Sequence, residues 1–144
     1  MILVDEEATA LTGAAIAGAA RAGDVITLSG PLGVGKTALA RGLLGALGHQ
    51  GEVPSPTFAI VQPYEELDPP VWHVDLYRIE DAAEIVELGL DSAAEALLVV
   101  EWPERAGVGA WPQALRLRLD FEPNGSRRLT AQVPEVWEGR WPPQ

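Results

Sequence analysis

The spacing of hydrophobic residues changes several times along the chain, and each change predicts a new element. Short apolar runs at 25–29 and 97–100 are typical of buried strands. Leucines at helical spacing predict a helix from about residue 36 to 47. An alanine-rich run over 6–22 predicts another helix, which we expect to end at Gly23 because glycine commonly follows a helix C-terminus.

Two hairpins are predicted as well. Residues 58–64 and 71–77 both alternate between apolar and polar positions, and a short proline-containing turn separates them, as in antiparallel neighbours. Residues 115–121 alternate strictly, and Asn124-Gly125 then turns the chain into a returning strand over 128–133. Helices between buried strands, combined with hairpins, predict an α/β fold with a mixed rather than a purely parallel sheet.

A glycine-rich loop joins the predicted strand at 25–29 to the next helix. Its sequence over residues 30–37, Gly-Pro-Leu-Gly-Val-Gly-Lys-Thr, matches the phosphate-loop pattern G-x-x-x-x-G-K-[ST] at every fixed position. In such a loop, glycines let backbone N–H groups point at a phosphate, and the helix N-terminus adds its positive dipole. Lys36, the single lysine of the chain, would contact the β- and γ-phosphates, and the Thr37 hydroxyl would be a Mg²⁺ ligand.

Nucleotide hydrolysis also needs acidic residues, and two carboxylates follow apolar segments. Asp75 ends the segment that begins at residue 71, which is how a second magnesium-linked acid is presented; a capping or loop aspartate would have the same spacing. Glu101 directly follows the run at 97–100, where a carboxylate faces the ligand crevice of an α/β sheet. It could equally be a surface residue that pairs with Arg105.

Other candidate residues are defined by residue type rather than by spacing. Ser55 and Thr57 lie in a proline-flanked loop and are candidates for a switch that senses the γ-phosphate through Mg²⁺, although an ordinary proline-rich turn has the same composition. Arg41, Arg78 and Arg105 are candidates for stabilising charge in the transition state. An arginine from a partner protein is an equal candidate for that role.

Composition narrows the classes of function. A chain of 144 residues that is 47% hydrophobic predicts one domain, over 1–133, followed by a tail over 134–144. The absence of cysteine and the presence of only two histidines exclude thiol catalysis, disulfides and Cys- or His-built metal sites. A net charge of −11 argues against direct, tight binding of tRNA or DNA. The sequence lacks a signal peptide and a membrane-length apolar run, so we expect a cytoplasmic protein without a membrane partner.

Four short blocks follow one another along the chain: Gly30-x-Leu32-Gly33-x-Gly35-Lys36-Thr37, Ser55-Pro56-Thr57, His73-x-Asp75-Leu76-Tyr77-Arg78 and Glu101-Trp102-Pro103. In this order and spacing they resemble the TsaE (YjeE) family, small bacterial P-loop ATPases needed to make N6-threonylcarbamoyladenosine in tRNA. The likeness covers residues 5 to 133 and is more specific than the phosphate loop alone.

The resemblance implies a three-layer P-loop NTPase-like fold, with a mixed central sheet flanked by helices and a C-terminal β-hairpin, and ATP and Mg²⁺ as cofactors. It implies that Glu101 and Lys36 are catalytic and that Thr37 and Asp75 bind the metal. The implied nucleotide contacts are Gly33, Val34, Gly35, Lys36, Thr37, Ala38, Thr57 and Trp102. Pro31 and Ala38 depart from the family pattern, which often has Asp and Thr there, and these departures bear on nucleotide affinity.

The resemblance also implies slow ATP hydrolysis and action on a TsaB–TsaD protein pair rather than on tRNA directly. We expect ATP and Mg²⁺ to order the loop around Thr57, which would control a partner surface. Two alternatives are a P-loop small-molecule kinase and a nucleotide-gated interaction module without significant hydrolysis. A GTPase is disfavoured because base recognition there uses Asn-Lys-x-Asp, and Asn124 is the only asparagine.

Overall fold

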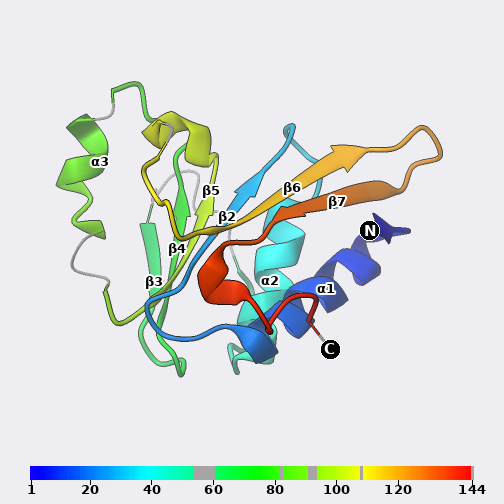
Figure 1. Ribbon diagram of the computed structural model, residues 1–144, viewed down its shortest axis with the longest axis horizontal. Coiled ribbons are helices and arrows are strands. Elements are labelled where there is room, and N and C mark those ends of the chain that lie inside the picture. Colours follow the sequence, from blue (N-terminus) through cyan, green and yellow to red (C-terminus); the bar gives the residue numbers. More distant parts are fainter. Residues whose placement is uncertain (54–60, 82, 91–93, 108, 144) are drawn as a thin grey trace.

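The computed structural model describes residues 1–53, 61–81, 83–90, 94–107 and 109–143. Three α-helices and seven strands alternate along this part of the chain, with two short 3₁₀ helices after the fifth and the seventh strand (Figure 1). In chain order they are β1 Ile2–Leu3, α1 Glu6–Ala19, β2 Val25–Ser29, α2 Lys36–Ala46, β3 Val61–Tyr64, β4 Val71–Asp75, α3 Ala83–Glu87, β5 Leu97–Glu101, η2 Pro103–Ala106, β6 Leu115–Phe121, β7 Arg127–Gln132 and η3 Glu135–Trp137.

All seven strands form one sheet in the order β1-β7-β6-β2-β5-β4-β3. The central pairs β2–β5, β2–β6 and β4–β5 are parallel, whereas β3–β4, β6–β7 and β1–β7 are antiparallel. The mixed sheet, the two hairpins and the flanking helices confirm the predicted fold class. Strand β1, a two-residue edge strand that the hydrophobic pattern does not predict, closes one side of the sheet.

Helices α1 and α2 pack together on one face of the sheet (Figure 1). Their contact depends on glycine, because a Cβ on Gly13 would lie 2.0 Å from the carbonyl oxygen of Leu39, and one on Gly42 would lie 2.0 Å from that of Ala10. A Cβ on Gly45 of the same helix, by contrast, would meet open space. Close backbone packing therefore explains why residue 42 is glycine, whereas the structure gives no reason for glycine at position 45.

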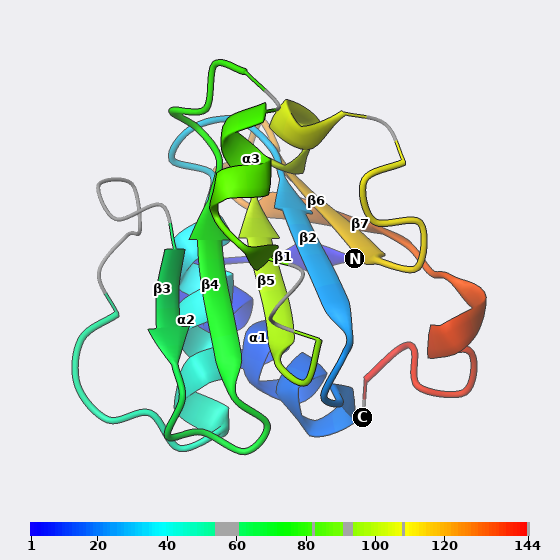
Figure 2. The ribbon, with the colours of Figure 1, turned by 90° about the vertical axis from the view of Figure 1, so that its left-hand side faces the viewer.

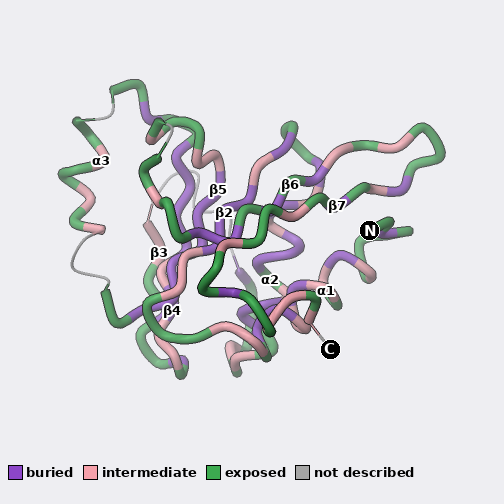
Figure 3. Tube along the Cα trace, in the orientation of Figure 1, coloured by how far each residue is buried: buried purple, intermediate pink, exposed green. Residues whose placement is uncertain are grey.

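The main hydrophobic core lies between α1, α2 and the sheet, and the central strands are buried (Figure 3). A smaller cluster lies on the opposite face, where residues around α3 and η2 cover β4 and β5 (Figure 2). Strand β5 is buried along its whole length, as the apolar run predicts. This smaller cover does not extend over β6 and β7, whose outward side chains stay exposed.

Three regions differ from the expectation. Strand β4 ends at Asp75, two residues before the end of the predicted segment 71–77. Helix α1 ends at Ala19, three residues before the predicted end, because Ala20 is extended and the Asp24 carboxylate accepts a hydrogen bond from the Arg21 N–H at 2.7 Å. Gly23 does have a positive φ of 87°, but it donates its N–H to the Ala96 carbonyl instead of ending the helix. The tail, for which the pattern predicts no element, contains η3.

The tail is attached by packing and by an ion pair. Trp137 is fully buried in the main core. Arg140 forms two hydrogen bonds with the Asp24 carboxylate, at 2.7 and 3.1 Å, and its guanidinium lies 4.1 Å from the centre of the Trp137 ring. Among the described residues, no helix is both long and apolar enough to cross a membrane.

Candidate functional site

The phosphate-loop segment joins β2 to α2 at the carboxyl end of the central strands. Gly30, Gly33 and Gly35 all have positive φ values, of 136°, 79° and 117°. A Cβ on Gly30 would lie 2.2 Å from the Leu119 carbonyl oxygen, so both its φ and its surroundings require glycine. Gly35 is the N-cap of α2 and offers no side-chain cap, which leaves the first N–H groups of α2 available to an anion.

Lys36 is buried at the base of this loop, with only 5% of its surface exposed. Its Nζ donates hydrogen bonds to the carbonyl oxygens of Gly30 and, at 3.3 Å, Pro31. The same ammonium lies 3.8 Å from the centre of the Trp102 ring. Burial lowers the pKa of Lys36, and the nearby Glu101 opposes this shift by stabilising the charged form.

Glu101 is the last residue of β5 and lies beside α2. The Thr37 hydroxyl is 3.3 Å from both of its carboxylate oxygens, and the Nε2 of His73 is 2.7 Å from Oε2. His73 is fully buried and Glu101 is 3% exposed. Because a carboxylate only accepts hydrogen bonds, Nε2 is the protonated ring nitrogen, and Nδ1 has no hydrogen-bond partner within the described part of the chain.

Asp75 ends β4, the strand parallel to β5, and pairs in register with Glu101. Its Oδ1 accepts a hydrogen bond from the N–H of Tyr77 at 2.9 Å, and the side chain is 5% exposed. The sheet thus brings Asp75, Glu101 and the Thr37 hydroxyl to one edge, at the N-terminus of α2. In the described ranges no group of three or more His, Asp or Glu residues could hold a metal ion. A Mg²⁺ ion needs no such group, because it usually takes one or two protein oxygens and completes its octahedron with phosphate and water.

Trp102 follows Glu101 in an unusual conformation. Its φ of 59° makes it the one non-glycine residue with positive φ in the described chain. The Trp102 N–H donates to the Leu28 carbonyl at 3.2 Å, and its ring lies 4.9 Å from that of Tyr77. These contacts hold the indole across the ammonium of Lys36.

A cavity of about 540 Å³ opens above the loop and contains the side chains just described. Six of the predicted nucleotide-binding residues line it within the loop and α2: Gly33, Val34, Gly35, Lys36, Thr37 and Ala38. Asp75, Glu101 and Trp102 line it as well. Its volume is in the range of small-molecule and cofactor pockets.

The outcome differs among the remaining candidate residues. Thr57 and Ser55 lie outside the described residues. Arg41 lines the cavity, where its guanidinium is 3.8 Å from the Glu6 carboxylate, whereas Arg105 lies 5.8 Å from the ring of Tyr77.

Three residues of the site have no role assigned from the sequence, although His73 and Tyr77 belong to one of the four blocks of motifs. His73 stands two positions before Asp75 on the same strand face, and that spacing is a usable signal. Tyr77 follows the strand and lines the cavity. Arg127, on the β6–β7 hairpin, donates from Nε to the Val34 carbonyl at 3.0 Å, so the hairpin supports the phosphate loop. No local pattern predicts this last contact, because 93 residues separate its partners.

Comparison with known proteins assigns the chain to a family. The family model described as "Threonylcarbamoyl adenosine biosynthesis protein TsaE" matches residues 3–129. The chain is similar to the tRNA threonylcarbamoyladenosine biosynthesis proteins TsaE of Streptomyces coelicolor (46% identity, 69% of this chain and 70% of the relative) and Bacillus subtilis (41%, 69% and 63%). It is also similar to that of Haemophilus influenzae (39% identity, 67% and 63%).

A solved structure gives the same picture. The crystal structure of Bacillus subtilis YdiB superposes with a TM-score of 0.82 at 27% identity, covering 96% of this chain and 88% of that one. The sequence matches span between 63% and 70% of the length of the three relatives named above. The range that the family model matches includes all four blocks of motifs. The chain therefore belongs to the TsaE family of tRNA threonylcarbamoyladenosine biosynthesis proteins.

Proposed function

We propose that this protein binds ATP with Mg²⁺ and hydrolyses it slowly, in support of threonylcarbamoyl modification of tRNA adenosine. One observation carries the proposal: Lys36, Thr37 and Glu101 converge at the N-terminus of α2, inside a cavity of about 540 Å³. The side chains of Lys36 and Glu101 are buried. Burying a charged side chain costs free energy of folding, so two such residues in one place indicate a structural or functional role.

The triphosphate would be held by the phosphate loop. Gly33, Gly35 and the free N-terminus of α2 supply backbone N–H donors, and Lys36 supplies a fixed positive charge. The Lys36 ammonium now donates to backbone carbonyl oxygens, and it would have to leave them in order to bind phosphate. This change is favourable because hydrogen bonds between two charged groups are stronger than those from a charged donor to a neutral acceptor. Local donors matter here because the net charge of −11 repels an anion.

The residues present fit a magnesium ion. Thr37 and Asp75 supply a hydroxyl and a carboxylate from adjacent elements, the pair of ligands that P-loop NTPases use. When bound, the ion neutralises the charge that develops on the phosphate oxygens. Glu101 stands next to Thr37 and adds negative charge on the same side of the cavity.

Glu101 would be the catalytic carboxylate. His73 holds Oε2 at 2.7 Å, whereas Oε1 has only the 3.3 Å contact with Thr37 among the described residues. Oε1 is therefore the oxygen that can orient a water and accept its proton. A carboxylate held on one side and free on the other is suited to positioning, the main requirement of phosphoryl transfer.

The protein would act in the cytoplasm on a partner complex of the TsaB–TsaD type, through a nucleotide-dependent switch. Membership of the TsaE family supports a role beside the other proteins of this pathway. The strongly acidic composition supports protein partners over direct tRNA binding. The switch would use the loop that contains Thr57.

A kinase acting on a small metabolite is the less supported alternative, because the cavity residues described above are accounted for by nucleotide and metal. An interaction module that binds ATP without hydrolysis differs from the proposal only at Glu101. The test is therefore Glu101→Gln, which keeps the shape of the side chain and removes its charge. Phosphate release is measured with the purified partner complex, and nucleotide affinity is measured alongside.

We expect Glu101→Gln to lower turnover by at least about 100-fold, as for other catalytic bases, while nucleotide affinity changes little. Lys36→Met is the matched variant for binding and should weaken nucleotide affinity. Turnover of Glu101→Gln equal to that of the unaltered protein would favour the non-hydrolysing module. ADP formation that depends on a small metabolite instead of the partner complex would favour the kinase.

A further inference from the structure

A second cavity, of about 500 Å³, lies on the face of the sheet opposite α1 and α2. It lies between the β2–β6–β7 part of the sheet and the segment that follows Glu101. Trp111, Pro103 and Gly107 form its wall on that side. The nucleotide cavity and this one share no lining residue. We call it the back groove.

The floor of the back groove is a regular grid of polar side chains. In the sheet register, Arg116 of β6 lies between Thr27 of β2 and Gln132 of β7. One step further along, Arg118 lies between two hydroxyls, those of Ser29 and Thr130. All six side chains lie on the face away from the main core, because the residues that alternate with them, such as Leu28, Leu117 and Leu129, belong to that core. Thr27 is itself buried, whereas both arginines, Thr130 and Gln132 are exposed.

An open, polar surface is unusual for a sheet face in this class of fold. A sheet face in an α/β protein is normally covered by helices, and the neighbouring β4–β5 part of this face is covered by an apolar cluster. The β2–β6–β7 part carries polar side chains and stays open. Two of the nine arginines of an acidic chain lie here on one strand, two residues apart.

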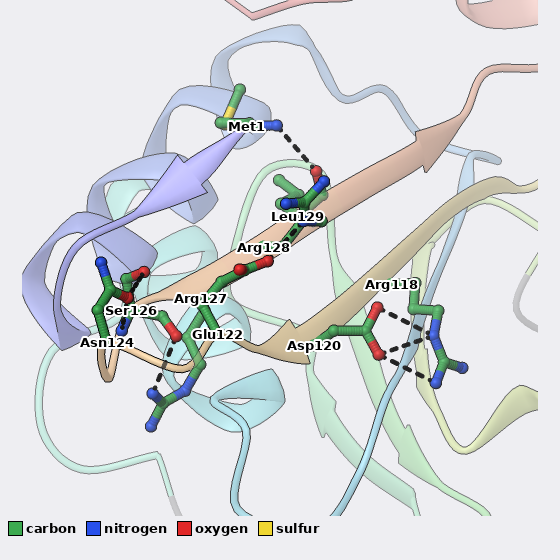
Figure 4. Close-up of polar contacts among 9 residues, drawn as sticks. All are labelled: Met1, Arg118, Asp120, Glu122, Asn124, Ser126, Arg127, Arg128 and Leu129. Carbon is green, nitrogen blue, oxygen red and sulfur yellow. Dashed lines mark hydrogen bonds and ion pairs between the residues drawn. The ribbon is translucent and has the colours of Figure 1, made fainter.

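The two arginines differ in what they already bind. Arg118 pairs with Asp120 of its own strand, at 3.1 Å, on the exposed surface (Figure 4). The side chain of Arg116 has no hydrogen bond or ion pair with any residue that the structure describes. Its guanidinium is exposed above the groove, with a planar set of donors that matches a carboxylate.

We propose that the back groove binds a carboxylate-bearing segment of a protein partner, with Arg116 as the main contact. Charge complementarity carries the proposal, because a guanidinium without an ion pair in the described ranges projects from a grid of hydroxyl and amide groups. Those neutral groups would satisfy the backbone of an extended segment laid across the strands. A single strong contact at Arg116, with Glu104 on the rim, fits one carboxylate of a flexible peptide better than the regularly spaced phosphates of nucleic acid.

The position of the groove links it to the nucleotide cavity through the sheet. Arg118 lowers the pKa of Lys36, and Glu104, at the rim of the groove, raises it. The proposal itself does not require ATP hydrolysis, so its test contains no nucleotide.

The test uses a fluorescein-labelled hexaglutamate peptide with blocked ends, titrated with the full chain and followed by fluorescence anisotropy. The salt concentration is about 0.15 M, where charges more than about 8 Å apart are largely screened. Labelled hexaglutamine and hexauridylate RNA are titrated in parallel. The variants are Arg116→Gln, the charge-retaining Arg116→Lys, and Arg21→Gln as a matched control at an exposed arginine remote from the groove.

We expect hexaglutamate to bind more tightly than hexaglutamine, and Arg116→Gln to weaken it about tenfold or more, as for loss of a bidentate ion pair. Arg116→Lys should retain part of the affinity, and Arg21→Gln should change it less than about twofold. Circular dichroism checks that each variant is folded. Equal weakening by Arg21→Gln, equal binding of hexaglutamine, or tighter binding of hexauridylate through Arg116 would overturn the proposal.

Discussion

The Nε2 of His73 lies 2.7 Å from Oε2 of Glu101, and both side chains are buried. They come from the parallel strands β4 and β5, so the sheet itself fixes their separation. His73 thus provides the strongest hydrogen bond to the carboxylate that we assign to catalysis. Asp75, two residues further along β4, stands beside the same carboxylate.

Substitutions of His73 distinguish its role in positioning Glu101 from its contribution to folding stability. In His73→Leu, Glu101 loses its closest donor while it stays buried, so we expect a loss of about 1–3 kcal/mol in the free energy of unfolding. Turnover should fall through kcat, with little change in KM, because the nucleotide contacts remain. His73→Gln, which can place an amide N–H near the same point, should recover part of kcat. Equal kcat in all three proteins would show that His73 does not position Glu101.

Nucleotide binding should be visible in the fluorescence of Trp102. The Lys36 ammonium lies 3.8 Å from the centre of its ring, and this contact must change when Lys36 turns to phosphate. We expect Mg²⁺ with ADP to shift the tryptophan emission, and Trp102→Phe to remove most of that shift. Trp111→Phe, on the far face, should keep it. A shift that persists in Trp102→Phe would contradict the assigned position of the nucleotide.

The contact between α1 and α2 gives a matched pair of glycine substitutions. A Cβ at Gly42 would meet the Ala10 backbone at 2.0 Å, so Gly42→Ala should lower the free energy of unfolding by at least about 1–3 kcal/mol. A Cβ at Gly45 meets open space, so Gly45→Ala should raise it by about 0.5–1 kcal/mol through helix propensity. Chemical denaturation measures both. Equal effects would contradict the helix packing.

The tail should contribute to stability. Trp137 is fully buried in the main core, so Trp137→Ala should lower the free energy of unfolding by about 3–5 kcal/mol. Its neighbour Val136 is 48% exposed, and Val136→Ala should change it by less than about 0.5 kcal/mol. Both are measured by thermal or urea unfolding. A small effect of Trp137→Ala would mean that the tail does not pack as described.

Local patterns predict much of this architecture. Periodicity identifies β2, α2, β5 and the β6–β7 hairpin, because each has a strong apolar spacing or a turn with specific residues. The end of α1 could not be predicted, since it depends on a hydrogen bond between Arg21 and Asp24 and on the docking of Gly23 to the start of β5. The packing of Trp137 depends on contacts with distant elements in the same way.

Some residues of the candidate site could be predicted from the sequence, and others could not. The phosphate loop, Asp75 and Glu101 are visible in the sequence because each stands at the end of a predicted strand or helix. The contact of His73 with Glu101 and that of Arg127 with Val34 depend on strand order, which local spacing does not encode. The assignment of Thr57 to a switch concerns a residue outside the described ranges, so it stays a prediction.

The central claim is that ATP hydrolysis at Glu101 supports tRNA modification. Its most direct test is reconstitution of threonylcarbamoyl transfer to tRNA with the purified partner proteins, measured over many turnovers. We predict that adding the chain increases the amount of modified tRNA, and that Glu101→Gln does not, although it still binds ATP. Full stimulation by Glu101→Gln, or no stimulation by the unaltered chain, would contradict the account.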